Sequence, residues 1–130
     1  MEFTSVNKLF QEAFKKNWDR PAISNYQGIT LHYRDVARRI EKMHIIFEEC
    51  GLEKGDKVAL CSRNQANWAV AFLSALTYGA VPVPLLHEFK SSNIHHLVNH
   101  SEAKILFVDD VIWEGITETE MPALQAIIQV

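Results

Sequence analysis

The sequence predicts an α/β fold: a parallel-sheet βαβαβ unit with helices on both faces, preceded by an N-terminal helix and a small β-hairpin. Three short apolar runs indicate the strands, at residues 58–61, 80–86 and 105–108. Residues 58–61 show no polar alternation, which is typical of a strand covered on both faces. Segments with helical spacing and short links separate the runs, and this order favours parallel strands joined by right-handed crossovers. The 130 residues suffice for one domain with one core.

An amphipathic helix is expected at the start of the chain. Thr4 or Ser5 can cap it, and Lys15 and Lys16 suit its last turn, where backbone carbonyls leave partial negative charge. One apolar stripe follows the helical spacing: Val6, Leu9, Phe10, Ala13 and Phe14. Residues 17–21 are expected to end this helix.

A hairpin and a long helix come next. Residues 22–24 and 29–31 are short β-prone pieces on either side of a turn, and together they predict a hairpin. From about residue 33 to residue 50 the spacing becomes helical, with an apolar stripe of Val36, Ile40, Met43 and Phe47. Gly51 can adopt the left-handed conformation that ends a helix, and Leu52 can then fold back as a hydrophobic contact.

Residues 55–86 read as a strand, a buried helix and a second strand. Asn64 is the expected cap of the helix, which runs from Trp68 to Tyr78 and is apolar nearly all round. Two prolines interrupt the strand that follows. Because a proline has no N–H, this strand must lie at an edge, be bulged, or pair through its other residues.

The last third of the chain is expected to alternate between helix and strand. Ser91 or Ser92 can cap a helix whose inward residues are Ile94, Leu97 and Val98. After the strand at 105–108, a final helix is predicted over residues 113–126, although Pro122 interrupts it. Residues 127–130 begin a further β-prone run, so Val130 is interpreted as a fragment boundary.

Composition excludes several classes of protein. The net charge of −3 and the pI of about 6.0 argue against a general nucleic-acid binder, which needs a basic surface. The N-terminus lacks the layout of a signal peptide, and polar residues and prolines break the apolar run at 68–86, so no membrane span is predicted. The two cysteines, Cys50 and Cys61, form no CxxC motif and are expected to be free thiols.

Known nucleotide and nucleophile motifs are absent. The five glycines are isolated, so the sequence contains neither GxGxxG nor GxxxxGK[ST], the loops that cradle phosphates. Ser62 follows a strand without a GxSxG motif, and Glu88 and Glu102 show no identifiable partner. Tryptophans are expected in or near the core rather than as a stacking platform: Trp18, Trp68 and Trp113.

Two groups of polar residues could carry chemistry. His96 and His100 have the i, i+4 spacing of zinc sites, but no third ligand is evident beside His95, so surface histidines with adventitious metal binding are favoured. Asp109 and Asp110 follow a strand where open α/β sheets place ligands. Adjacent strand residues point to opposite faces, so turn residues are favoured over a carboxylate pair.

From Leu31 to Asp109 the sequence resembles the N-terminal part of the acyl-adenylate-forming enzymes, and especially the long-chain-fatty-acid–CoA ligases. The matching segments are LHYRDV, GLEKGDKVALCSRN, WAVAFLSALTYGAVPVPL and SEAKILFVDD. Each segment is weak alone, and their order and spacing are specific in combination. Two positions depart from the family pattern: His32 replaces a usual threonine, which is expected to alter helix capping, and Asn67 replaces a common glutamate.

The resemblance implies that residues 1–130 are the N-terminal portion of an AMP-binding (acyl-adenylate-forming) large domain, with the remainder of the enzyme absent. The parent ligase would use ATP and Mg²⁺ to activate a long-chain fatty acid as acyl-AMP, and would then transfer the acyl group to coenzyme A. The fragment alone would be inactive, with no catalytic, cofactor-binding or metal residue and no cofactor of its own. The implied partner of the parent is a small-molecule carboxylate, and no nucleic acid. The parent would be cytoplasmic or membrane-peripheral, and the fragment is expected to self-associate through an unpaired sheet edge.

Two alternatives remain open. The chain could be a self-contained flavodoxin-like binding module without catalysis. It could also be the N-terminal part of an amino-acid adenylating domain or of a short-chain acyl synthetase.

Overall fold

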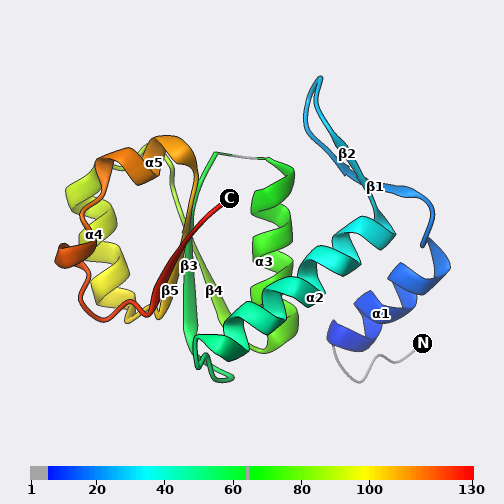
Figure 1. Cartoon of the computed structure of the whole chain (residues 1–130), viewed down its shortest axis with the longest axis horizontal. Helices are drawn as coiled ribbons and strands as arrows, with labels where there is room; N and C mark the ends of the chain where they lie inside the picture. The colour runs from blue at the N-terminus through cyan, green and yellow to red at the C-terminus, as the bar shows by residue number, and fades with distance from the viewer. Residues whose placement is uncertain (1–5, 64) are drawn as a thin grey trace.

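The computed structural model describes residues 6–63 and 65–130, which form a helix, a hairpin and an α/β unit (Figure 1). The elements are α1 (Val6–Lys16), β1 (Pro21–Ser24), β2 (Thr30–His32), α2 (Tyr33–Glu49), β3 (Lys57–Cys61), α3 (Ala66–Tyr78), β4 (Val81–Leu85), α4 (Ser91–Ser101), β5 (Ile105–Val108), α5 (Asp110–Gly115), the 3₁₀-helix η1 (Glu118–Glu120) and β6 (Ala126–Gln129). The predicted N-terminal helix, hairpin and long helix are confirmed.

The main sheet is parallel throughout, with the strand order β4-β3-β5-β6. Strand β3 lies between β4 and β5, so the chain moves to one side of β3 and then crosses to the other. This confirms the predicted parallel βαβαβ unit. A fourth strand, β6, extends the sheet beside β5.

Helices cover both faces of the sheet, as predicted (Figure 1). Alternate residues of each strand enter different cores because side chains in a strand point to opposite faces. Val58 and Phe107 belong to a core shared with α2 and α3, whereas Ala59 and Leu106 belong to a core shared with α4. Each strand residue of β5 is buried, which explains its uninterrupted apolar sequence.

The N-terminal part has a smaller core of its own. Leu31 of the hairpin, Val36 of α2 and Val70 of α3 are buried together, and Phe14 of α1 packs against them. The described part of α1 contains no fully buried residue: Phe14 packs against this core, whereas Val6 and Leu9 of the predicted apolar stripe are exposed. Helix α1 is therefore an incompletely covered layer over α2 and α3.

Helix ends agree with the sequence in part. Gly51 has φ of 73°, and the N–H of Leu52 donates to the carbonyl of Phe47 at 2.9 Å, which confirms the predicted C-cap. Leu52 itself is buried in the core. Gly79 ends α3 with φ of 95°.

The predicted N-cap residues are not confirmed at any of the helix starts that the structure describes. Thr4, Ser5 and Asn64 lie outside the described residues. The N-cap of α3 is Gln65, and a side chain from the hairpin turn binds the helix instead: Oδ1 of Asn25 accepts from the N–H of Ala66 at 2.7 Å. Neither Ser91 nor Ser92 caps α4, because the N-cap position is Lys90 and the helix begins at Ser91.

His32 is the N-cap of α2, at the position where a threonine was expected. The cap depends on the backbone of His32, whose N–H donates to Oδ2 of Asp35 at 2.9 Å, and the ring Nδ1 lies 3.4 Å from the same oxygen. The hydrogen bond from the His32 backbone lowers the pKa of Asp35. Asp35 therefore supplies the interaction that stabilises this helix start.

Strand β4 lies at an edge of the sheet, as its prolines predict. The N–H of Val81 donates to the carbonyl of Asp56 at 2.8 Å, so the backbone N–H of Val81 points toward β3, which begins at the next residue. Backbone groups alternate in direction along a strand, and Pro82 and Pro84 therefore face away from β3. The missing N–H groups cost no ladder hydrogen bond.

The predicted helix over residues 113–126 is wrong. Helix α5 ends at Gly115 and η1 follows, whereas β6 confirms the β-prone run predicted from residue 127. A Cβ on Gly115 would lie 2.9 Å from Oγ of Ser91, so α5 packs closely against the start of α4 and cannot continue on that line. Pro122 then breaks helical hydrogen bonding, and pairing with β5 satisfies the backbone of β6.

The tryptophans are also only partly as expected. Trp68 is half-buried against the core of α2 and α3. Trp18 and Trp113 are 41% and 43% exposed, so the prediction that they lie in or near the core is wrong.

Candidate functional site

The strand order places a topological switch point between β3 and β5. From β3 the chain passes through α3 to β4 on one side, and β5 lies on the other side. Open α/β sheets bind ligands at the carboxyl ends of the strands at such a point. Ser62 and Arg63 follow β3 here, and Asp109 follows β5. Together with Asp110, these residues form the candidate site, which we call the switch-point cluster.

Asp109 is the centre of the switch-point cluster, and its side chain is 1% exposed. Its Oδ2 accepts from the backbone N–H of Arg63 at 2.9 Å and from Nε of Arg63 at 3.1 Å. Its Oδ1 accepts from the N–H of Ile112 at 2.9 Å, which makes Asp109 the N-cap of α5. Three donors therefore satisfy the buried carboxylate.

Arg63 connects the two neighbouring aspartates. Its Nη2 donates to Oδ1 of Asp110 at 2.8 Å, while its Nε binds Asp109. The prediction of a strand-ending residue agrees with Asp109, which caps α5, whereas Asp110 is the first residue of that helix. Sequence reasoning missed that Arg63 connects the two aspartates. The available signal was a cation two residues after the end of β3, the strand beside β5.

Two pKa values are shifted here, one for Asp109 in the switch-point cluster and one for Cys61 beside it. Burial alone would raise the pKa of Asp109, but hydrogen bonds from the backbone of Arg63 and Ile112 and the Arg63 guanidinium outweigh it, and the pKa lies below its usual value. Burial and the nearby Asp109 charge raise the pKa of Cys61 to about 11. Its Sγ donates to the carbonyl of Leu86 at 3.6 Å. The hydrogen bonds thus stabilise the ionised form of Asp109. The raised pKa makes Cys61 a poor nucleophile.

The switch-point cluster does not fit ATP or Mg²⁺. A nucleotide phosphate needs a cation or converging N–H groups, yet Arg63 and the N–H groups of residues 63 and 112 already bind Asp109. For a magnesium ion, the guanidinium of Arg63 already compensates the charge of both aspartates and would lie beside the metal as a second cation. Within residues 6–63 and 65–130, no three potential ligands converge on a metal position.

The other candidate residues remain apart. The rings of His96 and His100 stack with centroids 6.0 Å apart on the exposed face of α4, and Nε2 of His95 accepts from the N–H of Thr117 at 2.9 Å. Oγ of Ser62 donates to the carbonyl of Arg63 at 3.0 Å and accepts from Nε2 of Gln65, so no base activates it.

The remaining candidates are two glutamates and two cysteines, and none of them joins the switch-point cluster. Glu88 lies 4.0 Å from Nε2 of His87, so it has a distant partner that the sequence did not identify. Glu102 ends α4 with φ of 59°, which is a structural position. Cys50 and Cys61 are both free thiols, as predicted.

Comparison with known families gives a match over most of the chain. The family model described as AMP-binding enzyme matches residues 10–130. Surfactin synthase subunit 2 of Bacillus subtilis (strain 168) is 27% identical over 108 residues, which are 83% of this chain and 3% of that protein. Long-chain-fatty-acid–CoA ligase ACSBG2 of Xenopus laevis is 28% identical over 131 residues, which cover 96% of this chain and 18% of the ligase. The chain therefore spans a small part of the relatives that it matches.

Solved structures share the fold. The anthranilate CoA ligase AuaEII in complex with anthranoyl-AMP superposes with a TM-score of 0.89 at 16% identity, over 98% of this chain and 25% of that one. The nonribosomal peptide synthetase FmoA3 in its α-methyl-L-serine-AMP bound form superposes with a TM-score of 0.83 at 18% identity, over 95% of this chain and 14% of that one. At these identities the likeness concerns the fold alone.

Proposed function

The chain belongs to the AMP-binding enzyme family, and from this premise we propose that it is the N-terminal part of a longer acid–thiol ligase. In the proposed reaction a carboxylate attacks the α-phosphate of ATP to form an acyl-adenylate and pyrophosphate, and the thiol of coenzyme A then displaces AMP. The family match over residues 10–130 is the observation on which this proposal rests.

We propose a long-chain fatty acid as the carboxylate. The frog long-chain-fatty-acid–CoA ligase aligns with 96% of the chain, and the segments around WAVAFLSALTYGAVPVPL resemble such ligases. An amino acid is the second candidate, because FmoA3 is a peptide synthetase bound to an amino-acid adenylate and has the same fold over 95% of this chain. A short-chain acid is the third.

The proposed role of residues 1–130 is to form one wall of the large domain. The chain covers 3% to 18% of the two relatives described above, so most of the ligase lies outside it. In the switch-point cluster the Arg63 guanidinium already binds both aspartates, so it is not a free cation for a phosphate. The chemistry supplied by ATP, Mg²⁺ and coenzyme A would therefore be performed by other parts of the parent protein.

We further propose that the parent is cytoplasmic, or peripheral to a membrane. Among the helices that the structure describes, none has both the length and the apolar character needed to cross a bilayer. The partner would be a small-molecule carboxylate.

Pyrophosphate exchange tests the proposal. The 130-residue chain is expected to give no exchange above background with any acid, whereas the longer product of the same gene should exchange with a long-chain fatty acid. A panel of long-chain, short-chain and amino acids assigns the substrate. Exchange by the 130-residue chain alone would contradict the proposal, as would a gene product that ends at Val130.

A further inference from the structure

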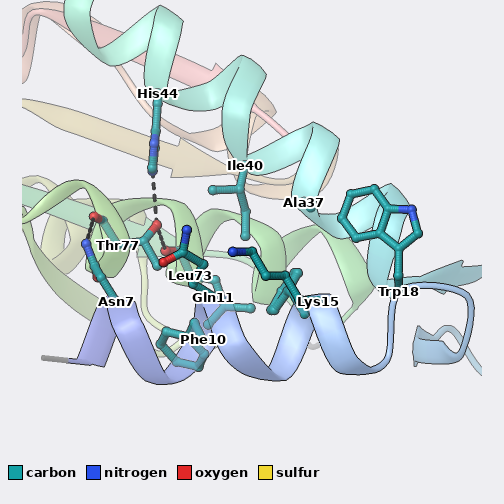
Figure 2. A pocket seen from close by; sticks show the side chains of 11 residues that line it. Asn7, Phe10, Gln11, Lys15, Trp18, Ala37, Ile40, His44, Leu73 and Thr77 are labelled. Atoms are coloured by element: carbon teal, nitrogen blue, oxygen red, sulfur yellow. Dashed lines mark hydrogen bonds between the residues drawn. The ribbon is translucent and has the colours of Figure 1, made fainter. Parts of the chain in front are cut away.

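An apolar groove lies between the first three helices, on the far side of α3 from the sheet (Figure 2). Its volume is about 340 Å³, which falls in the range of small-molecule sites, roughly 300–1,000 Å³. We call it the three-helix groove. Its lining residues are Asn7, Phe10, Gln11, Phe14, Lys15, Trp18, Ala37, Ile40, His44, Leu73 and Thr77.

The walls of the three-helix groove are mostly hydrocarbon. Helix α1 contributes the aromatic rings of Phe10 and Phe14. Trp18 lies at one end of the groove (Figure 2). Ile40 of α2 and Leu73 of α3 form the opposite wall. Trp18 is 41% exposed, so this large ring keeps apolar surface that the described chain does not cover.

Polar groups at the other end of the groove are satisfied. Oγ1 of Thr77 donates to the carbonyl of Leu73 at 2.7 Å, and it can therefore only accept from Nε2 of His44, which lies 3.0 Å away. Nε2 of His44 also lies 3.1 Å from the carbonyl of Ser74, so Nε2 carries the hydrogen. Nδ2 of Asn7 donates to the carbonyl of Thr77 at 2.7 Å. These groups hold α1 and α2 against α3.

Two donors in the groove have no such partner. The side chains of Lys15 and Gln11 extend from α1 between the helices (Figure 2). Within the described part of the chain, neither makes a hydrogen bond or an ion pair. An ammonium and a carboxamide beside an apolar wall are complementary to an anion that carries a hydrocarbon group.

We propose that the three-helix groove binds a medium-chain monocarboxylate without transforming it. The hydrocarbon chain lies against Phe10, Ile40 and Leu73, and the carboxylate accepts from Nζ of Lys15 and Nε2 of Gln11. One carboxylate offers two oxygens for these two donors, whereas a phosphate dianion calls for more positive charge than a single lysine supplies. This site is separate from the proposed ligase reaction, because binding needs neither ATP nor the rest of the parent enzyme.

Titration of the 130-residue chain with decanoate, well below its critical micelle concentration, tests the proposal by two-dimensional NMR. The indole N–H resonance of Trp18 is expected to shift saturably, and the indole resonances of Trp68 and Trp113, which lie outside the groove, should not shift. Decyltrimethylammonium has the same chain with a cationic head, and it should bind at least about tenfold more weakly because of Lys15.

Matched variants separate the charge from the hydrocarbon contact. Lys15→Gln should weaken decanoate binding about threefold to tenfold, since it removes one charged donor. Lys16→Gln is the control: it removes the neighbouring charge of α1, which does not line the groove, and should change binding less than about twofold. Ala37→Phe fills the groove and should abolish the Trp18 shift, with circular dichroism confirming that the variant folds.

Several results would overturn the proposal. Equal binding of the anionic and cationic chains, or equal effects of Lys15→Gln and Lys16→Gln, would show that the groove does not select an anion. A Trp18 resonance that shifts with protein concentration and not with decanoate would show that a second copy of the chain fills the groove. Absence of any saturable shift would show that the groove binds no such acid.

Discussion

Nε of Arg63 lies 3.1 Å from the carboxylate of Asp109, a residue 46 positions later in the chain. This contact joins the carboxyl ends of the adjacent strands β3 and β5. Asp109 also holds the first turn of α5. One carboxylate thus connects two strands and a helix at the point where related architectures leave a crevice.

Replacing Asp109 with asparagine should destabilise the chain by about 2–3 kcal/mol. Oδ1 can still cap α5, but the charged hydrogen bonds to Arg63 are lost and an amide N–H₂ group would face the Arg63 donors. Asp110→Asn is the matched control: its carboxylate is 68% exposed, so the loss should be at most about 0.5 kcal/mol. Urea unfolding curves measure both free energies. Equal losses for the two variants would show that burial of Asp109 adds nothing.

The contribution of Asp109 should depend on pH. Its folded pKa lies below the unfolded value near 3.8, so its stabilisation is complete above that value and is lost as the pH falls through the folded pKa. The difference in unfolding free energy between the native chain and Asp109→Asn should therefore be constant at neutral pH and shrink below about pH 4. A difference that grows on acidification would mean that the pKa is raised instead.

The two thiols should react at very different rates. Cys61 is 0% exposed with a pKa of about 11, so about one molecule in a thousand carries its thiolate at pH 8. Cys50 is half-buried and should react first with a disulfide reagent. Cys50→Ser should remove the fast phase and leave the slow one, which should accelerate in denaturant. Fast labelling of Cys61 in the folded Cys50→Ser variant would refute its burial.

Alanine at Gly79 should destabilise the chain by more than alanine at Gly51. Both glycines have positive φ, 95° and 73°, and a Cβ there costs about 1–2 kcal/mol. At Gly79 the Cβ would also lie 3.2 Å from Cγ of Lys54, whereas at Gly51 no atom lies within 4 Å. Thermal unfolding of the two variants measures the difference. A larger loss at Gly51 would show that the contact with Lys54 carries no cost.

The 130-residue chain is expected to self-associate through the open edge of β6. Analytical ultracentrifugation should show mass rising with concentration, and the backbone amides of β6 should exchange hydrogen more slowly at high concentration. The amides of β4, at the opposite edge, should be unaffected. A monomer at all concentrations would contradict this expectation.

Local patterns predicted the parts of the fold that depend on local interactions. Residues 58–61 and 105–108 contain no alternating polar residues, because helices cover both faces of their strands. The cap at Gly51 and the contact of Leu52 follow from the requirement for positive φ and from short-range hydrogen bonds.

Long-range contacts decided the features that the sequence did not predict. Residues 116–125 are predicted to continue a helix, and instead the chain leaves α5 and leads into β6, which pairs with β5. The contact between Arg63 and Asp109 exists only because β3 and β5 are neighbours. The groove beside Trp18 needs three helices at once, so no single stretch of sequence shows it.

The prolines of β4 have a consequence for how this sheet can grow. Because Pro82 and Pro84 turn their ring nitrogens outward, the outer margin of β4 offers carbonyl acceptors but lacks donors at these two positions. A new strand could not form a regular ladder there. The two edges of the sheet therefore differ: the β4 edge cannot pair regularly with another strand, whereas the β6 edge can. A further strand would have to be added beside β6.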